Sequence, residues 1–387
     1  QRQMCIRDRA TVSLKRSIDF STLQALLPTL LSVEACTLDA HSGEFQLQFD
    51  AGDGETLQRE FSDALATRGA AIEWTSAAES AEHVERLYSL DAAVLTVIAP
   101  GEALPVNELL SIFAEWDVQL LALRRLSAGL EGRPRAVECY LGEADLPSIR
   151  PRLAAIADRW GVDLCIQAAA DKRPRRRLFV FDMDSTLIDC EVIDELAIRA
   201  GVGDEVSAVT ARAMRGEIDF RSSFTERMAR LEGLERSELE SIAATLPIMP
   251  GAARLLRYLG ALGHHTAILS GGFDYFARRV QTQLGVDEIH ANRLQISGGR
   301  LTGRVDGEIV DGQRKVYLLR TIAEREGFAM ADTVAVGDGA NDLPMLDAAG
   351  IGVAFHAKPL VLQRARCAIS HADLSALLYV IGVAEAR

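Results

Sequence analysis

Two patterns of hydrophobic and polar positions divide the chain. Up to about residue 170, short apolar strands and amphipathic helices follow the order strand, helix, strand, strand, helix, strand, once over 10–80 and again over 86–170. This order predicts an antiparallel sheet covered on one face by two helices. From residue 178 onwards strands alternate with helices, which is typical of a doubly wound parallel sheet. We therefore expect two α+β units followed by an α/β domain over 178–387.

One long interruption divides the α/β half. After the strand LFVFD (178–182), mostly helical sequence extends to about residue 245 before the next strand begins. An insertion at this place lies over the carboxyl edge of a parallel sheet, where open α/β sheets bind ligands. We expect a helical cap over about 190–245 above a Rossmann-like core.

Composition and charge narrow the classes of function. Hydrophobic residues make up 48% of the chain and charged residues 25%, which is typical of a soluble globular protein. The net charge of −13 opposes binding to nucleic acid or to an anionic membrane surface. No apolar run of about 18 residues predicts a membrane span. The basic run KRPRRR lies between the two halves, so we expect 171–177 to be a solvated linker.

The cysteines and the first nine residues indicate the cellular compartment in which the protein is expected. The six cysteines lie far apart and form no CxxC pair, so neither a disulfide framework nor a zinc site is indicated, and we expect a cytoplasmic protein. The first residues, QRQMCIRDR, have no hydrophobic core of a signal peptide and look unrelated to the rest of the chain. We expect 1–9 to be a non-native leader.

Polar residues follow three of the predicted parallel strands: Asp182 after LFVF, Ser270 after TAIL and Asp338 after TVAVG. Each one alone fits an ordinary helix cap or turn. Because the carboxyl ends of parallel strands meet at one edge, we expect the three to converge, with Asp184, Asn341 and Asp342 nearby. Gathered carboxylates repel one another unless a cation holds them, and oxygen ligands of this kind suit Mg²⁺.

This set of residues has the chemistry that hydrolysis of a phosphate monoester requires. Asp182 can attack phosphorus, and Asp184 can protonate the leaving group if its pKa lies above the usual value of about 3.9. Ser270, the amides of Gly271 and Gly272, and Lys315 can hold the phosphoryl oxygens. Lys315 begins a predicted helix, where the helix dipole disfavours a cation, and an anion site would explain it.

The motifs FDMDSTLID, SGGF (270–273), Lys315 and GDGAND (337–342) occur together and in order. They resemble the four motifs of the haloacid dehalogenase-type phosphohydrolases, and within them the phosphoserine phosphatases, over about 178–371. The resemblance implies that Asp182 is the nucleophile and Asp184 the general acid and base. It implies that Asp182, the backbone carbonyl of Asp184 and Asp338 bind Mg²⁺, with Asp342 in the supporting metal or phosphate shell. Ser270 and Lys315 are expected to bind phosphate, and Asn341 is expected among the substrate-binding residues.

The resemblance also implies a substrate, O-phospho-L-serine, hydrolysed to L-serine and phosphate in the last step of serine biosynthesis. By this resemblance Glu191 pairs with the substrate amino group, Phe220 closes the pocket, and Arg227 holds the carboxylate. A zwitterion needs one carboxylate and one guanidinium partner on any account, and arginine can bind a carboxylate through two hydrogen bonds. Taken alone, Glu191 and Arg227 also fit the exposed faces of amphipathic helices.

The two N-terminal units resemble ACT-type small-molecule regulatory modules in the order of their elements, most clearly around APGEALPVNELLSIFAEW. This resemblance implies an amino-acid effector, and the alternatives are homodimerisation and plain structural support. For the whole chain two alternatives stay open. One is a phosphatase or phosphotransferase of the same superfamily acting on another small phosphomonoester, and the other is a non-catalytic amino-acid sensor. A P-type ATPase is excluded, because it needs membrane spans and typically a threonine where Asp184 stands.

Overall fold

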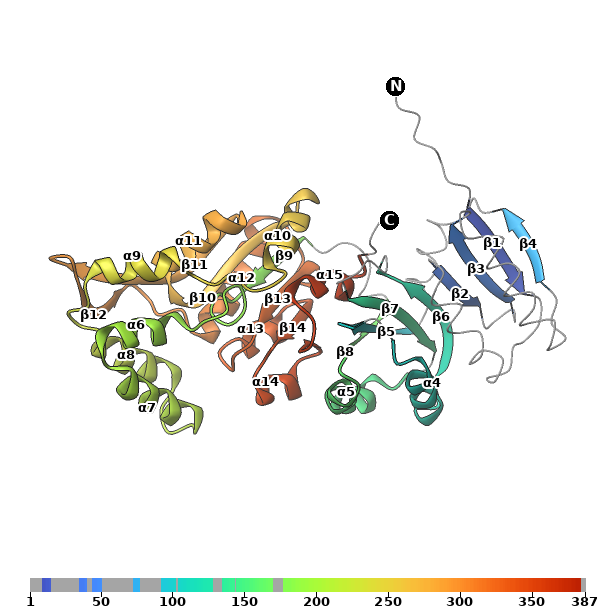
Figure 1. Cartoon of the computed structure of the whole chain (residues 1–387), viewed down its shortest axis with the longest axis horizontal. Coiled ribbons are helices and arrows are strands. Elements are labelled where there is room, and N and C mark those ends of the chain that lie inside the picture. The colour runs from blue at the N-terminus through green and yellow to red at the C-terminus, as the bar shows by residue number, and fades with distance from the viewer. Residues whose placement is uncertain are drawn as a thin grey trace, which may run out of the picture. The chain divides into compact units, whose positions relative to one another are not determined.

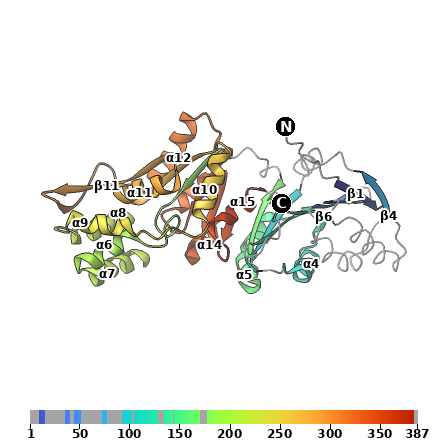
Figure 2. The same ribbon diagram turned by 45° about the horizontal axis from the view of Figure 1, so that its top comes forward.

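The computed structural model describes residues 9–14, 35–39, 44–50, 72–76, 92–101, 104–127, 134–142, 144–169 and 177–383. The chain divides into two compact units, one made of residues 1–174 with 378–387 and one of residues 175–377. Figures 1 and 2 show their strands and helices from two directions. The second unit thus ends at Leu377, whereas the sequence analysis extended the α/β domain to residue 387.

Residues 92–168 form the second repeat of the first unit in the predicted order of elements. These are β5 (Ala92–Ala99), α4 (Val106–Glu115), β6 (Gln119–Arg125), β7 (Arg135–Gly142), α5 (Leu146–Trp160) and β8 (Asp163–Ala168). All the strand pairs are antiparallel, in the order β8-β5-β7-β6. Leu109 and Phe113 of α4 and Leu153 of α5 are buried, as expected for helices that cover a sheet.

The first repeat is described through its strands. They are β1 (Arg9–Leu14), β2 (Ala35–Asp39), β3 (Glu44–Asp50) and β4 (Ile72–Ser76), in the order β2-β3-β1-β4. Strand β2 pairs antiparallel with β6 at Ala35–Arg124 and Cys36–Leu123, so the two repeats share one sheet. The predicted helices of this repeat and residues 1–8 of the expected leader lie outside the described residues.

The end of the chain also belongs to the first unit. Helix α15 (Leu377–Val380) is followed by Ile381 and Gly382. The side chain of Gln167 on β8 donates to the carbonyl of Val380 at 3.0 Å, and Arg124 on β6 donates to the carbonyl of Gly382 at 3.3 Å. These bonds fasten the last described residues to the sheet of the second repeat.

The second unit is built on a mainly parallel sheet with the strand order β12-β11-β10-β9-β13-β14-β15. Its strands are β9 (Leu178–Phe181), β10 (His265–Phe273), β11 (Glu288–Ser297), β12 (Arg300–Asp306), β13 (Thr333–Gly337), β14 (Ile351–Phe355) and β15 (Cys367–Ile369). All neighbours are parallel except β11 and β12, which form a hairpin. The central β9 is buried throughout, which explains its continuous apolar run. This is the doubly wound, Rossmann-like core that the sequence predicts.

Two strands differ from their predicted bounds. Strand β10 continues past Ser270 to Phe273, with a shift of register between Leu269 and Phe273. Strand β11 begins at Glu288, ahead of the segment RLQISGGRLTGRV (293–305) whose pattern predicts two short strands, because residues 288–292 pair with β10. Both extensions depend on a partner strand, which the local pattern does not reveal.

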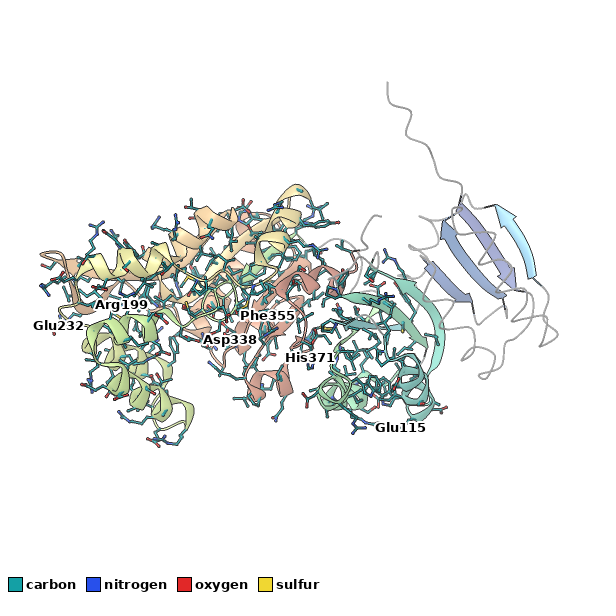
Figure 3. All side chains as sticks on the ribbon, in the orientation of Figure 1. Glu115, Arg199, Glu232, Asp338, Phe355 and His371 are labelled. Carbon is teal, nitrogen blue, oxygen red and sulfur yellow. The ribbon has the colours of Figure 1, made fainter. Side chains whose placement is uncertain are left out.

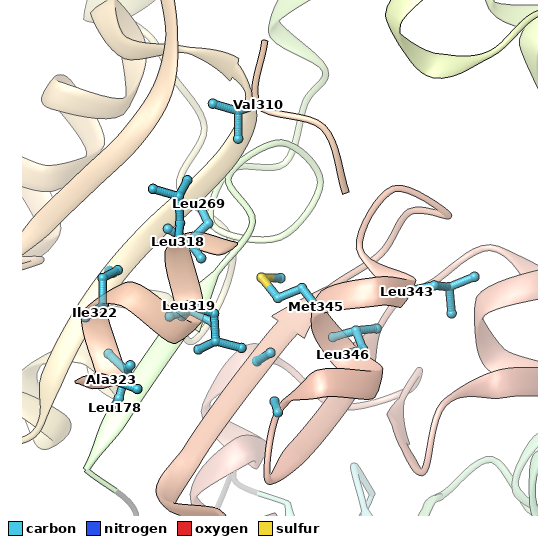
Figure 4. Packing of buried hydrophobic residues seen from close by; sticks show 14 of the residues in the cluster. Leu178, Leu269, Val310, Leu318, Leu319, Ile322, Ala323, Leu343, Met345 and Leu346 are labelled. Carbon is cyan, nitrogen blue, oxygen red and sulfur yellow. The ribbon is translucent and has the colours of Figure 1, made fainter. Parts of the chain in front are cut away.

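Helices cover the sheet of the second unit: α10 (Ala252–Ala261), α11 (Asp274–Leu284), α12 (Gly312–Arg325), α13 (Leu343–Ala348) and α14 (Pro359–Arg364). Figure 4 shows how Leu318 and Ile322 of α12 approach Leu178 and Leu269 of the sheet, within a single buried cluster. Burying such a side chain contributes roughly 1.5–3 kcal/mol. No helix in the described part of the chain is long and apolar enough to cross a membrane.

The cap consists of α6 (Val192–Ala200), α7 (Gly203–Met214), α8 (Phe220–Arg230) and α9 (Arg236–Ala244), within the expected 190–245. Helix α8 starts where Asp219 accepts a hydrogen bond from the amide of Ser222 at 2.7 Å, as an N-cap residue does. The β11–β12 hairpin is bonded to the cap, because Leu301 exchanges backbone hydrogen bonds with Gly233 and Leu234 at 2.8 and 2.9 Å.

Candidate active site

Three neighbouring strands place acidic and hydroxyl groups at one edge of the second unit's sheet. Asp182 follows the central β9, Ser270 lies near the end of β10, and Asp338 follows β13. One carboxylate oxygen from each of Asp182, Asp338 and Asp342 lies within 4.8 Å of the other two. Asp338 follows Gly337, which pairs with Ala354 of β14 next to Phe355; both Asp338 and Phe355 are labelled in Figure 3. The structure thus brings together the strand ends that the sequence predicts to converge.

Lys315 bridges two of these carboxylates. Its Nζ lies 2.9 Å from Asp182 Oδ1 and 2.6 Å from Asp342 Oδ1, and its side chain is fully buried. Burial lowers the pKa of Lys315, but Asp182 and Asp342 outweigh burial, so the pKa is raised and the lysine stays charged. Lys315 lies in the first turn of α12, beyond the N-cap Asp311.

Burial and mutual repulsion raise the pKa values of the clustered aspartates. The pKa of Asp338 rises to about 6, first through burial and then through Asp342. Burial and Asp342 also raise the pKa of Asp182 well above its usual range, against the opposing charge of Lys315. A divalent cation relieves such repulsion, and these buried carboxylate oxygens are the donors that Mg²⁺ prefers, so the site fits that ion.

Asp184 lies in a different environment two residues beyond Asp182. Burial, with a further contribution from Glu191, raises its pKa to about 7, although the amide of Val192 donates to its Oδ1 at 3.1 Å. A raised pKa is the direction that a general acid requires. Next to it Ser185 adopts a left-handed conformation, with φ of 55°, and its hydroxyl donates to Glu191 Oε1 at 3.0 Å.

The last residues of β10 approach Asp184 and the cap. Ser270 is buried, and its Oγ accepts a hydrogen bond from the amide of Gly272 at 2.8 Å. A Cβ atom on Gly272 would collide with Asp184 Oδ2, and one on Gly271 would lie 3.0 Å from Phe220 Cζ. Only glycine allows the chain to pass this close to Asp184 and to Phe220 of the cap.

The cap contributes Phe220 and Arg227 from α8. They lie seven residues apart, which places them on one face of the helix. The half-buried Arg227 has an Nε that finds no hydrogen-bond partner among the described residues. Burial lowers its pKa, and the neighbouring carboxylates of Asp194 and Glu191 oppose that effect. An acidic ligand group would satisfy this donor.

Asn341 and Lys358 complete the edge. Asn341 is partly buried in the turn between Asp338 and Asp342. The sequence analysis missed Lys358, which precedes α14. Its Nζ lies 3.6 Å from Asp338 Oδ2 and its amide donates to the Asp338 carbonyl at 3.2 Å. Its position just after the strand IGVAF, at the same sheet edge, was the available clue.

Comparison with known proteins gives one consistent result. The family model of the haloacid dehalogenase-like hydrolases matches residues 179–347. A phosphoserine phosphatase of Archaeoglobus fulgidus is 45% identical over 241 residues, which cover 62% of this chain and 70% of the relative. The chain belongs to the phosphoserine phosphatase family. Its motifs at Asp182, Ser270, Lys315 and Asp338 all lie within the matched region.

Two further members of the phosphoserine phosphatase family support the assignment. The enzyme of Streptomyces coelicolor is 47% identical over 248 residues, covering 64% of this chain and 60% of that relative. The chain therefore spans less than two thirds of the length of this relative. A solved structure of a phospho-aspartyl intermediate analogue of phosphoserine phosphatase superposes with a TM-score of 0.51 at 40% identity, covering 53% of this chain and 98% of that structure.

Proposed function

We propose that this chain is a Mg²⁺-dependent phosphoserine phosphatase that hydrolyses O-phospho-L-serine to L-serine and phosphate, the last step of serine biosynthesis, in the cytoplasm. The observation that carries the proposal is the buried Lys315 bridging Asp182 and Asp342, with Asp184 beside them at an elevated pKa. This arrangement provides a nucleophile, an acid and a fixed cation at one point, which hydrolysis of a phosphate monoester requires.

Asp182 is the nucleophile. The amide of Met183 donates to its Oδ1 at 2.7 Å, and Lys315 lies 2.9 Å from the same oxygen. Because both donors engage Oδ1, the second oxygen, Oδ2, is the one left to attack phosphorus. The phosphorus–oxygen bond to serine breaks as the new bond forms, which leaves an aspartyl phosphate.

Asp184 moves the protons. With a pKa of about 7 it is substantially protonated at neutral pH, so it can donate its proton to the departing serine oxygen. The resulting carboxylate then takes a proton from the water that hydrolyses the aspartyl phosphate. The close approach of Gly272 to Asp184 supports this role, because it places the phosphate-binding segment beside the acid.

The ion would be Mg²⁺, and the carboxylates of Asp182 and Asp338 and the backbone carbonyl of Asp184 would hold it, with the Asp342 carboxylate in the supporting shell. When bound, it neutralises charge on the phosphoryl oxygens. The buried, mutually repelling carboxylates support this assignment. The remaining phosphate oxygens are bound by five residues: Ser270, Gly271, Gly272, Lys315 and Asn341.

Substrate choice lies with Glu191 and the cap. Glu191 is close enough to Asp184 to raise its pKa, so a substrate amino group that pairs with Glu191 lies near the reacting centre. The unsatisfied Nε of Arg227 supports a role in binding the substrate carboxylate. Phe220, which packs against Gly271, closes the pocket.

The experiment is phosphate release with Mg²⁺ from L-phosphoserine, phosphothreonine, phosphoglycolate, a sugar phosphate and an aryl phosphate. A strong preference for L-phosphoserine, with turnover falling by about 10³-fold or more in Asp182→Asn, supports the proposal. Preference for another phosphate would keep the aspartate mechanism and refute the substrate. Transfer to an added alcohol in place of water would favour a phosphotransferase. Absence of turnover in the wild-type protein would favour a non-catalytic sensor.

A further inference from the structure

A buried amide outside the four motifs joins two of their segments. Asn292 lies on β11 beside Phe273 of β10 and is 1% exposed. Its Nδ2 donates to the carbonyl of Gly271 at 2.8 Å, and its Oδ1 accepts a hydrogen bond from the amide of Val310 at 2.9 Å. Both ends of the side chain are thus engaged by backbone groups from different parts of the sequence.

Both backbone partners belong to segments that the proposed function assigns to phosphate binding. Gly271 lies between Ser270 and Gly272 near the end of β10, where the register shifts. Val310 immediately precedes Asp311, the N-cap of α12, which carries Lys315. One side chain therefore fixes the separation between this glycine segment and the start of the helix that carries the buried lysine.

The bond to Gly271 also sets the orientation of a peptide group. No peptide bond among the described residues is cis, and in a trans peptide the C=O and the following N–H point in opposite directions. Holding the Gly271 carbonyl on Asn292 therefore turns the Gly272 amide away from β11. That amide donates to Ser270 Oγ at 2.8 Å, and Gly272 lies beside the carboxylate of Asp184.

We propose that Asn292 is a positioning residue for the phosphate site, which holds the Gly271–Gly272 peptide and the start of α12 in the geometry that binds the phosphoryl group. This inference rests on the proposed function. An amide side chain of this length offers a donor to Gly271 and an acceptor to Val310 without taking up a proton. A carboxylate of the same shape would place a second oxygen against the Gly271 carbonyl, which would repel it.

The test compares Asn292→Asp with a matched control, Thr333→Val. Thr333 is also fully buried and also makes one donated and one accepted hydrogen bond, to the Met330 carbonyl at 2.7 Å and from the Gly350 amide at 3.1 Å. It begins β13, so it lies at the amino end of the sheet and away from the phosphate site. The control therefore removes comparable bonds in the same unit at the opposite edge.

Three quantities are measured with Mg²⁺ present: the affinity for inorganic phosphate by titration calorimetry, kcat and KM for L-phosphoserine and an aryl phosphate, and the midpoint of thermal unfolding. We expect Asn292→Asp to weaken phosphate binding by about tenfold or more and to lower kcat on both substrates, since a misoriented donor affects the shared phosphate. Thr333→Val should lower the unfolding midpoint while phosphate affinity stays within about twofold of wild type.

Wild-type phosphate affinity in Asn292→Asp, or an equal loss in Thr333→Val, would overturn the inference. If Asn292→Asp does not fold, Asn292→Ala is measured instead, with the same expected loss of phosphate binding and the same overturning result. The two proposals fail differently. A wild-type protein that neither binds phosphate nor turns over any phosphate monoester would refute the proposed function itself, whereas an active wild type with an unaffected Asn292 variant would refute only the role of Asn292.

Discussion

At the scale of single residues, Arg227 offers the sharpest test of substrate choice. Its buried Nε finds no hydrogen-bond partner among the described residues, so a substrate carboxylate is the expected one. We predict that Arg227→Ala raises KM for L-phosphoserine by roughly 10- to 100-fold. This range corresponds to the free energy that a hydrogen bond to a charged group contributes to binding. KM for an aryl phosphate, which lacks the carboxylate, should change little. Steady-state kinetics on both substrates checks this.

Arg230, on the last turn of the same helix, is the matched control. Its Nε makes no hydrogen bond within the described part of the chain either, but it lies 2.7 Å from Glu205 in an ion pair, and its Nη2 donates to Glu226 Oε1 at 3.4 Å, so its charge is paired within the cap. Arg230→Ala removes an equal charge from α8 and should leave both KM values near wild type. A comparable rise in KM for L-phosphoserine in both variants would contradict the role given to Arg227.

At the scale of elements, the β11–β12 hairpin and the cap should act as one body. Gly303 on β12 has a φ of 72°, and a Cβ there would lie 3.2 Å from Ala229 Cα of α8. We predict that Gly303→Ala separates the hairpin from α8, raises KM for L-phosphoserine and speeds amide hydrogen exchange over 220–236. Mass spectrometry of exchange and kinetics together measure this.

Gly307 provides a control that distinguishes backbone strain from the contact between the hairpin and α8. Its φ of 85° imposes a similar backbone cost, but a Cβ there meets nothing within 4 Å. Gly307→Ala should lose some stability without faster exchange in the cap. Identical exchange profiles for the two variants would show that the hairpin does not hold the cap.

Glu288 connects three elements of the second unit, and its titration makes the free energy of unfolding depend on pH. Burial raises its pKa, but hydrogen bonds from Arg325 of α12, His265 of β10 and His290 of β11 lower it to about 2. Because its folded pKa is depressed, its contribution is full above its ordinary pKa of 4.5 and is lost as the pH falls towards about 2. We predict that Glu288→Gln is less stable than wild type by about 2 kcal/mol at pH 7.

That difference should shrink as the pH falls from 4.5 towards 2, because wild-type Glu288 then becomes neutral as well. Urea unfolding of both proteins at pH 7 and at successively lower pH values measures it. A difference that stays constant over this range would mean that the charge of Glu288 contributes nothing.

At the scale of the whole molecule, the acidic edge should make stability depend on Mg²⁺. An ion that binds only the folded chain stabilises it by about 2.7 kcal/mol at 100 times its dissociation constant. We predict that Mg²⁺ raises the unfolding midpoint and that EDTA reverses this and silences hydrolysis. Asp338→Asn should be more stable than wild type without metal, since it removes a repelling charge, and should gain less from Mg²⁺. Calorimetry that finds equal gains in both proteins would contradict the metal site.

Much of the second unit could be predicted from the sequence, because its patterns are local. The apolar run of β9, the strand ends at Asp182 and Asp338, and the extent of the cap all follow from periodicity within short windows. The environment of Lys315 could not be predicted, since it depends on Asp342, 27 residues further along the chain. The role of Asn292 could not be predicted for the same reason, because an asparagine in a strand has no distinguishing pattern until its hydrogen-bond partners are known. The N-terminal predictions of a dimer interface and an effector site stay predictions.

The fastening of residues 380 and 382 to the first unit changes how the two units are linked. The chain leaves the first unit after residue 174 and returns to it at residue 378, so the second unit is an inserted domain with two covalent tethers. One tether contains the run KRPRRR, whose lysine and arginine residues are of the type after which trypsin cuts. A single cut there should give two bands on a denaturing gel and one species on a native column, because the second tether and the docked end still hold the pieces together. Release of the second unit requires a second cut beyond residue 377.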